Sequence, residues 1–264
     1  MKSDSIIQGS VLSGSNTPFP RKKTSCCVIP VYNNASTIRD VVQRTKAVIK
    51  NILIIDDGST DADLREYLKD LDVEVIRHET NRGKGAALCT ALKILQERSV
   101  DYMITLDGDG QHYPEDLPSI LARLDEKEGA LLVGCRNFNV PHVPLASRIG
   151  RKLSDFWIKM ETGISVEDSQ SGFRAYPVPY VTQIRYSSRH YNFETEILTR
   201  GIWGDLPVIH HGIRTSYPPP GERISHFRPW LDTFRISLLH LKLLLYRIRK
   251  GPTKSLLPRE TRQK

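Results

Sequence analysis

Short apolar segments alternate with segments of helical periodicity through the first half of this chain, and this alternation restricts the possible fold more than any other feature. The apolar segments have the length of strands, whereas the segments between them place apolar residues at helical spacing. The predicted strands and helices follow one another as residues 26–31, 36–49, 51–55, 62–71, 73–77, 86–97 and 102–106. Such an order is typical of βα units, so the sequence predicts an α/β fold with a mostly parallel central sheet flanked by helices.

Acidic and amide side chains follow three of the predicted strands. Asn33 comes after the first strand, Asp56 and Asp57 follow the second, and Asp107 and Asp109 follow the fourth. Ligands of open parallel sheets bind at the carboxyl ends of the strands. We therefore expect these side chains to line one polar crevice.

The segment Asp107–Gln111 has two aspartates one residue apart, with glycines between and after them. Carboxylate and amide oxygens are the ligands that Mg²⁺ and Mn²⁺ prefer, and glycine lets a ligand approach the backbone closely. A calcium loop of the EF-hand type would need glycine and glutamate where His112 and Pro118 stand, so that interpretation is excluded. A metal–diphosphate site and a simple polar turn remain.

Length and composition allow one large domain with a sizeable core, since 39% of the 264 residues are hydrophobic. The net charge of +8 is unevenly spread, because acidic residues slightly outnumber basic ones up to residue 130 and basic residues clearly outnumber acidic ones after it. This distribution suggests two different partners, and it leaves open a non-catalytic basic protein that binds nucleic acid or membrane. The four cysteines lack metal-ligand spacing, which favours reduced packing residues in a cytosolic protein.

The two ends of the chain are polar. Residues 1–23 are rich in Ser, Gly and Pro, and we expect a disordered leader there. Residues 251–264 predict a flexible tail. No segment approaches the roughly 18 uninterrupted apolar residues that a membrane-spanning helix needs.

The string TLDGDGQHYPEDLP, which contains Asp107–Gln111, resembles the D-x-D loop of family 2 glycosyltransferases with the GT-A fold, especially their dolichol-phosphate mannose synthase-like branch. Other motifs of the family have similar counterparts in the same order, namely Ile29–Asn33, Ile55–Asp61, Asn81–Gly85, Gly134–Arg136 (with cysteine in place of the usual serine) and Ser171–Tyr176. The resemblance implies a GT-A domain over residues 24–222, a UDP-, GDP- or dTDP-sugar donor, and Mg²⁺ or Mn²⁺ as cofactor.

By this resemblance, Asp109 and Gln111 are the expected metal ligands, and Asp57 is expected to read the base or ribose of the donor. The residues expected at the donor are Pro30, Tyr32, Asn33, Asp56, Asp57, Arg82, Lys84 and Asp107. An alternative role for Asp56 or Asp57 is to cap the helix predicted at 62–71.

The resemblance defines the acceptor side less closely. Asp168, Glu194 and Glu196 are expected at the transferred sugar, and with Asp109 they form the predicted catalytic set. If the acceptor is a hydroxyl, Glu194 or Glu196 is the candidate general base. If it is a lipid phosphate, the nucleophile is already anionic, and the candidate phosphate clamps are Arg136, Arg148, Arg151, Arg174 and Arg223.

The last patterned segment runs from Ile224 to Ile248, within a predicted helical region at 223–250. Its apolar stripe contains Ile224, Phe227, Leu231, Phe234, Leu238, Leu241, Leu245 and Ile248, with Leu239, Leu243 and Leu244 beside it. Arg228, Arg235, Lys242 and Arg249 recur every seven residues, and Pro229 indicates a break or a late start. A core helix, a dimer seam and a basic amphipathic anchor on anionic lipid all fit this pattern, and the anchor is favoured.

Together these features predict a metal-dependent, inverting glycosyltransferase that acts on a membrane-associated acceptor, with a polyprenyl or other lipid phosphate favoured over a hydroxyl of a lipid or glycan. The expected location is the cytoplasmic membrane face, as a peripheral protein without a nucleic-acid partner. The oligomeric state is left open.

Overall fold

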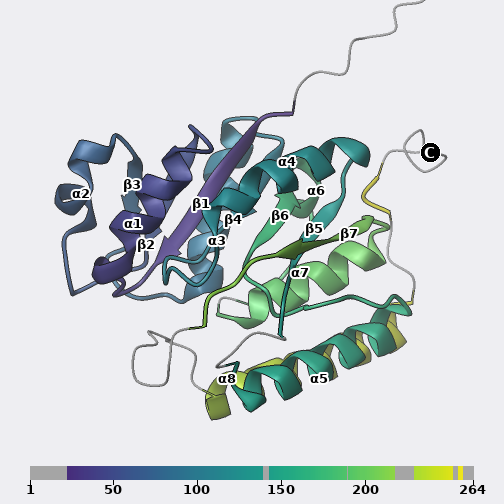
Figure 1. Cartoon of the computed structure of the whole chain (residues 1–264). Helices are drawn as coiled ribbons and strands as arrows, with labels where there is room; N and C mark the ends of the chain where they lie inside the picture. Colours follow the sequence, from purple (N-terminus) through teal and green to yellow (C-terminus); the bar gives the residue numbers. More distant parts are fainter. Residues whose placement is uncertain (1–22, 139–142, 189, 218–228, 252–254, 258–264) are drawn as a thin grey trace, which may run out of the picture.

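The computed structural model describes residues 23–138, 143–188, 190–217, 229–251 and 255–257. Within them a seven-stranded sheet has the order β3-β2-β1-β4-β6-β5-β7 (Figure 1). The strands are β1 (Ser25–Val31), β2 (Ile52–Asp56), β3 (Glu74–Arg77), β4 (Tyr102–Thr105), β5 (Leu131–Arg136), β6 (Arg174–Pro177) and β7 (Val208–Ile213). The predicted α/β architecture with a mostly parallel sheet is confirmed.

All strands except β6 run in the same direction. Parallel pairs join β1 to β2 and β4, β2 to β3, and β5 to β7, whereas β6 lies antiparallel between β4 and β5. The carboxyl ends of β1, β2, β4, β5 and β7 therefore share one edge with the amino end of β6. The polar motifs of the sequence meet at that edge.

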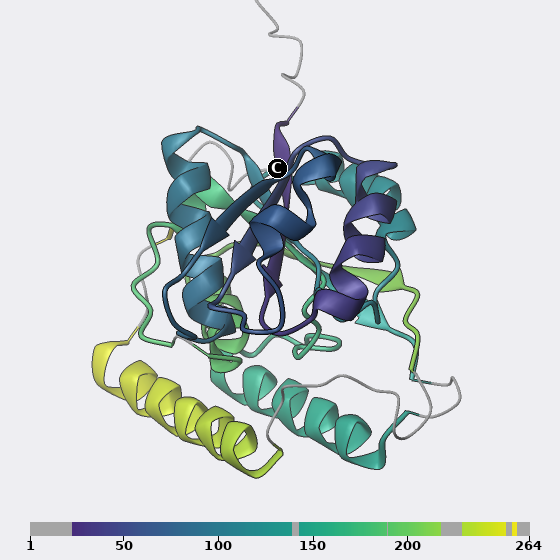
Figure 2. The same ribbon diagram turned by 90° about the vertical axis from the view of Figure 1, so that its left-hand side faces the viewer.

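Helices cover both faces of the sheet (Figures 1 and 2). They are α1 (Ala35–Lys46), α2 (Leu64–Tyr67), α3 (Lys84–Glu97), α4 (Leu117–Glu126), α5 (Leu145–Thr162), α6 (Val178–Val181), α7 (Asn192–Trp203) and α8 (Pro229–Lys250), with 3₁₀ turns η1 (Lys69–Leu71) and η2 (Pro114–Asp116). One apolar core packs α1, α2 and α4 on one face, and a second packs α3, α6 and α7 on the other.

The adjacent cysteines Cys26 and Cys27 lie on opposite faces of the sheet. Cys26 belongs to the core on the α3 face and Cys27 to the core on the α1 face, because successive side chains of a strand point to opposite sides. None of the cysteines, which all lie in the described residues, forms a disulfide. The interpretation of Cys26 and Cys27 as packing residues is confirmed.

Helices α5 and α8 lie side by side beneath the domain, at the end where α7 also packs (Figures 1 and 2). The ring of Trp157 stacks on that of His240, and His240 Nδ1 lies 2.9 Å from Glu161 Oε1. Leu239 and Leu243 turn toward Trp203 of α7. These contacts hold α8 against the domain.

The predicted apolar stripe of α8 is the side that faces away from the domain. Leu238, Leu241, Leu245 and Ile248 are exposed, while the residues expected only to widen the stripe, Leu239 and Leu243, are buried. Helix α8 is described from Pro229 onward. The stripe members Ile224 and Phe227 and the basic residue Arg228 lie outside the described residues.

Several local predictions differ from the structure. The helix expected at 62–71 is one turn of α-helix followed by η1, and its cap is Asp63, which accepts a hydrogen bond from the Arg65 N–H. Neither Asp56 nor Asp57 caps it. Within the predicted flexible tail, the structure describes two contacts: Leu256 donates its N–H to the Gly204 carbonyl, and Leu257 packs into the core.

No helix in the part of the chain that the structure describes is both long enough and apolar enough to cross a bilayer.

Candidate active site

The loops after β1 and β2 bind each other at the sheet edge. Asn33 adopts a left-handed backbone with φ of 51°, its side-chain oxygen accepts the Thr60 N–H, and its own N–H is donated to Ser59 Oγ. Asp56 is fully buried and pairs with Arg77 at 2.7 Å. Asn33 and Asp56 therefore shape this end of the crevice through contacts within the protein.

Asp57 organises the loop at residues 78–83. Its Oδ1 accepts the Arg82 N–H and lies 2.7 Å from His78 Nδ1, while its Oδ2 accepts the Gly83 N–H at 2.7 Å. These contacts join the second strand-end motif to the third, which lies just before α3. Of the other residues expected at the donor, Pro30 and Tyr32 are half-buried and Arg82 is exposed.

Lys84 neutralises Asp107. The Nζ of Lys84, on the first residue of α3, lies 2.6 Å from Asp107 Oδ1, and His112 Nε2 lies 3.7 Å from Asp107 Oδ2. Burial alone would raise the pKa of Asp107, but Lys84 and His112 hold it well below its ordinary value. Asp107 is therefore a carboxylate whose charge is already compensated.

Asp109 lacks such compensation. Its Oδ1 accepts the Gln111 N–H, and no Lys, Arg or His within the described residues forms an ion pair with it. Burial, and then the charge of Asp107, raise the pKa of Asp109 above its ordinary value. A partly buried carboxylate in need of positive charge, with the oxygen-bearing side chain of Gln111 two residues away, fits a hard divalent cation.

Protein side chains alone do not complete such a site. Among the described residues, no group of three His, Cys, Asp or Glu side chains is arranged to hold a metal ion. Mg²⁺ commonly takes one or two carboxylates from the protein and its other ligands from substrate phosphates and water. The donor set of Asp109 and Gln111 is of that incomplete kind.

The three carboxylates predicted on the acceptor side are all engaged with cations of the protein. Asp168 accepts from Arg136 Nε at 2.8 Å and Nη2 at 2.7 Å, and Glu194 pairs with Lys84 at 3.0 Å. Glu196 accepts the N–H groups of Ser187 and Ser188 and pairs with Arg200 at 2.8 Å.

The predicted catalytic roles of Asp168 and Glu196 stay predictions, and the contacts of both side chains in the structure are with the protein itself. Both side chains are fully buried, and each carboxylate is held by an arginine and by backbone N–H groups. Asp168 positions Arg136, and Glu196 fixes the segment before α7. Glu194 does reach the site, where it faces Lys84.

The arginines predicted to bind phosphate differ in how exposed they are. Arg174 is 1% exposed, and its guanidinium donates to the carbonyls of Ser169, Ser171 and Glu194, so in this structure it is engaged within the protein. On α5, Arg148 is exposed and Arg151 lies over the Phe138 ring at 4.2 Å. Arg223 lies outside the described residues.

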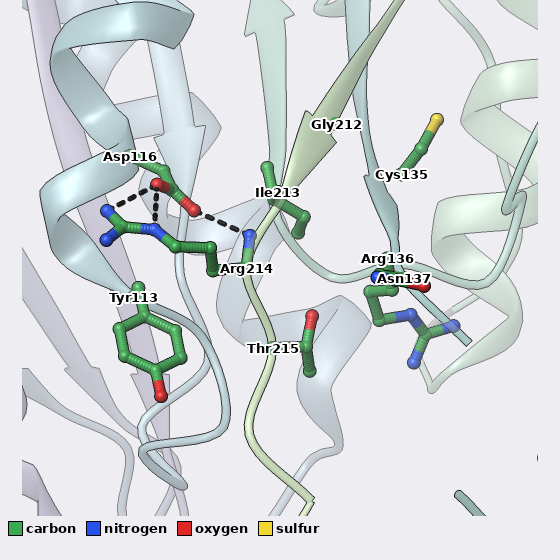
Figure 3. Close-up of a pocket in the computed structure, with 9 residues that line it drawn as sticks. All are labelled: Tyr113, Asp116, Cys135, Arg136, Asn137, Gly212, Ile213, Arg214 and Thr215. Atoms are coloured by element: carbon green, nitrogen blue, oxygen red, sulfur yellow. Dashed lines mark hydrogen bonds and ion pairs between the residues drawn. The ribbon is translucent and has the colours of Figure 1, made fainter. Parts of the chain in front are cut away.

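Arg136 lines a cavity of about 540 Å³ at the carboxyl ends of β5 and β7 (Figure 3). The cavity is lined by Tyr113, Asp116, Cys135, Arg136, Asn137, Gly212, Ile213, Arg214 and Thr215. In the view of Figure 3, Arg136 and Arg214 lie on either side of Thr215.

This cavity borders the loop Asp107–Gln111, the predicted metal site. The carbonyl of Gln111 accepts the Ser216 N–H, and His112 forms a β-bridge with Thr215. Arg214 is held by Asp116 through contacts of 2.6 and 2.8 Å and lies over the Tyr113 ring. Sequence reasoning missed Arg214 and Tyr113, although Arg214 lies in a segment, residues 207–216, whose pattern predicts a strand, and Tyr113 follows Asp107–Gln111 by two positions.

Comparisons with known proteins show what the chain as a whole is similar to. The family model described as "Glycosyl transferase family 2" matches residues 26–181. A UDP-N-acetylglucosamine–dolichyl-phosphate N-acetylglucosaminyltransferase of Methanococcus voltae is 31% identical, over 64% of this chain and 75% of that protein. A dodecaprenyl-phosphate galacturonate synthase of Rhizobium johnstonii is 26% identical, over 76% of this chain and 62% of that protein.

Solved structures show the same fold. Glucosyl-3-phosphoglycerate synthase of Mycobacterium tuberculosis, in complex with Mn²⁺, UDP and glucosyl-3-phosphoglycerate, superposes with a TM-score of 0.64 over 85% of this chain and 80% of that chain. The two sequences are 21% identical, so the likeness establishes the fold and not the substrate. The predicted GT-A fold is confirmed.

Proposed function

The chain belongs to glycosyl transferase family 2, and on that premise we propose that it transfers a sugar, with inversion, from a nucleoside diphosphate sugar to the phosphate of a polyprenyl lipid with the help of a divalent cation. It is therefore a glycosyltransferase, and the alternative of a non-catalytic basic binding protein is set aside. The proposal concerns the acceptor, the cation and the stereochemistry.

The main support for a phosphate acceptor is that the acceptor-side carboxylates are already paired with cations of the protein. A hydroxyl acceptor needs a base within hydrogen-bond reach that can take its proton. Of the carboxylates predicted for that role, Glu196 is saturated by Arg200 and two N–H groups, and Glu194 is engaged by Lys84. A phosphate needs no base, because its oxygen arrives already ionised.

In the proposed step, an oxygen of the acceptor phosphate forms a bond to the anomeric carbon of the sugar while the bond from that carbon to the donor diphosphate breaks. The electron pair of the broken bond stays with the leaving nucleoside diphosphate. Attack from the face opposite to the leaving group inverts the configuration. No proton has to be removed from the nucleophile.

Asp109 and Gln111 would hold Mg²⁺ or Mn²⁺, which supplies positive charge to the diphosphate as it leaves. The protein fixes these two ligands relative to each other through the hydrogen bond from the Gln111 N–H to Asp109 Oδ1. Asp107 is kept apart from that role by Lys84 and is left to face the donor ribose or sugar. The Mn²⁺ in the solved relative with the same fold supports this assignment.

The cavity at β5 and β7 is the proposed site of the acceptor phosphate. Arg136 and Arg214 both line it, and each is held in place by a carboxylate. Arginine held in this way offers N–H groups to phosphate oxygens without first losing side-chain freedom. The relatives that act on dolichyl phosphate and dodecaprenyl phosphate support an acceptor of this chemistry.

The paired helices α5 and α8 support a peripheral position on a membrane, which a polyprenyl acceptor requires. Exposed apolar side chains follow the outer side of both helices, namely Leu145, Ile149, Leu153, Phe156 and Met160 on α5 and Leu238, Leu241, Leu245 and Ile248 on α8. Exposed basic residues stand among them, including Arg148, Lys152, Lys242 and Arg249. Apolar and basic side chains on one surface fit an anionic lipid headgroup layer. Cysteines that form no disulfide among the described residues favour the cytoplasmic face.

The proposed function is tested by offering the purified protein UDP-, GDP- and dTDP-sugars with Mn²⁺ and one of two acceptors in the same detergent, a polyprenyl phosphate or the corresponding polyprenol. We expect a glycolipid product with the phosphate alone. Product from the polyprenol at a comparable rate would favour the hydroxyl acceptor.

A further inference from the structure

Lys84 connects the donor half of the site to the acceptor half. Its Nζ lies 2.6 Å from Asp107 Oδ1 on the loop Asp107–Gln111 and 3.0 Å from Glu194 Oε1 on α7. The side chain of Lys84 is 13% exposed and that of Glu194 is 6% exposed. One ammonium therefore pairs with a buried carboxylate, Glu194, and a partly buried one, Asp107, which lie 87 positions apart in the chain.

The surrounding backbone is built to leave room for this contact. A Cβ added to Gly172 would lie 2.3 Å from Asp107 Oδ2 and 2.7 Å from Lys84 Nζ. Gly172 does not have a left-handed φ, so its backbone conformation does not require glycine. Its carbonyl accepts a hydrogen bond from Thr105 Oγ1, which fixes the glycine against the end of β4. Glycine at this position provides space for the ion pair.

The charges of the cluster are balanced by Lys84. With the ammonium present, Lys84, Asp107 and Glu194 together carry one negative charge, and Asp109 adds its own. Without it, the carboxylates of Asp107 and Glu194 lose their shared cation, and the negative potential at Asp109 increases. Removing one partner of a buried pair is costly because the remaining charge stays buried.

We propose that Lys84 is a positioning residue, which orients Asp107 and Glu194 and, by neutralising Asp107, leaves Asp109 as the carboxylate that takes the divalent cation. The part of this proposal that concerns turnover rests on the proposed function, because a change in kcat can be measured only if the protein transfers sugar. The part that concerns charge does not, because it is a statement about the affinity of this protein for a divalent cation in the absence of donor and acceptor. The ammonium acts through the two carboxylates and does not itself contact the donor.

The first test uses Lys84→Met and measures binding of Mn²⁺ alone by EPR titration, without nucleotide or lipid. We expect Mn²⁺ to bind at least about tenfold more tightly than in the wild type, because a positive charge has been removed beside a divalent ion. A variant that had merely lost its fold would bind the ion more weakly. Unchanged or weaker binding in a variant with a native circular dichroism spectrum would overturn the claim about charge.

The double variant Lys84→Met/Glu194→Gln separates charge from position. Its cluster again carries one negative charge, so Mn²⁺ affinity is expected to return to within about threefold of the wild type. Its kcat is expected to stay at least about tenfold low with little change in the donor KM, because Asp107 still lacks its partner. Recovery of kcat together with Mn²⁺ affinity would overturn the positioning role.

Lys93→Met is the matched control, since Lys93 is an exposed residue of the same helix. It should leave both Mn²⁺ affinity and kcat at wild-type values. If the wild type transfers no sugar to any polyprenyl phosphate, the proposed function fails, while the Mn²⁺ titrations still decide the claim about charge.

Discussion

The space at Gly172 leads to a quantitative prediction for Gly172→Ala. The added Cβ would stand 2.3 Å from Asp107 Oδ2 and 2.7 Å from Lys84 Nζ, whereas ordinary contacts begin above about 3.4 Å. Relieving both contacts requires these side-chain ends to move by roughly 1 Å. Both are the ends of side chains and not backbone, so the fold accommodates the methyl group at small cost, about 1 kcal/mol.

The effect on catalysis is expected to be much larger than the effect on stability. A displacement of about 1 Å in a positioning group can lower turnover by about a hundredfold. We therefore expect Gly172→Ala to lower kcat by about tenfold to a hundredfold while the thermal unfolding midpoint falls by only a few degrees. The assay is steady-state release of the nucleoside diphosphate, with differential scanning calorimetry on the same preparations.

Gly150→Ala is the control, because a Cβ at Gly150 meets only the side chain of Gln170 at ordinary contact distance. It should leave kcat unchanged. Wild-type kcat in Gly172→Ala would refute the reasoning that Asp107 must stay where Lys84 holds it. A loss of kcat that merely followed a large loss of stability would refute the distinction between position and fold.

Three further predictions concern other parts of the account. Asp109→Asn should weaken Mn²⁺ binding in an EPR titration and lower kcat by at least about a hundredfold without changing the unfolding midpoint, and full activity would exclude Asp109 as the metal ligand. Burial alone would raise the pKa of Glu196, but Ser187, Ser188 and Arg200 hold it below its ordinary value of 4.5, so its stabilising effect is present at neutral pH and lost as the pH falls below 4.5 and through the depressed pKa. Glu196→Gln should therefore cost about 3 kcal/mol in urea unfolding at pH 7 and progressively less below pH 4.5, and a cost independent of pH would contradict the ion pair. Leu241→Glu/Leu245→Glu should lower sedimentation with anionic vesicles by at least about tenfold without a change in circular dichroism, whereas Glu97→Gln, at an exposed site on α3, should not, and unchanged sedimentation would exclude α8 from the membrane surface.

Local sequence patterns predicted the strands that carry the site. Apolar runs with polar residues at their ends located β1, β2 and β4, since strand length and alternation depend on the segment itself. The antiparallel strand β6 was not predicted as a strand. It has four residues within a polar motif, and its place between β4 and β5 depends on pairing with distant segments.

The roles of charged residues were harder to predict than their presence. Arg136 and Asp168 are 32 positions apart, and nothing in the local pattern indicates that they form a buried pair. The same holds for Lys84 and Glu194, which the fold brings together across the sheet edge. The pair of Glu196 with Arg200 is an exception, because its spacing of four residues on a helix was visible in the sequence.

The orientation of α8 on the domain was also not predictable from the sequence. Periodicity located both apolar sides of the helix but could not decide which one meets the protein. That choice depends on Trp203 of α7 and on Glu161 of α5, which contact Leu239, Leu243 and His240. The stripe with the strongest sequence pattern is consequently the exposed one.

The central claim is that the nucleophile is a lipid phosphate which needs no base from the protein. Its most direct test is the rate of sugar transfer to a polyprenyl phosphate and to the corresponding polyprenol, measured side by side for the wild type and for Glu194→Gln with the same donor and Mn²⁺. The account predicts transfer to the phosphate alone in both proteins. The rate of this transfer in Glu194→Gln should fall by no more than about tenfold, because the variant alters only the contact with Lys84. Transfer to the polyprenol that disappears in Glu194→Gln would contradict it, because Glu194 would then be a general base.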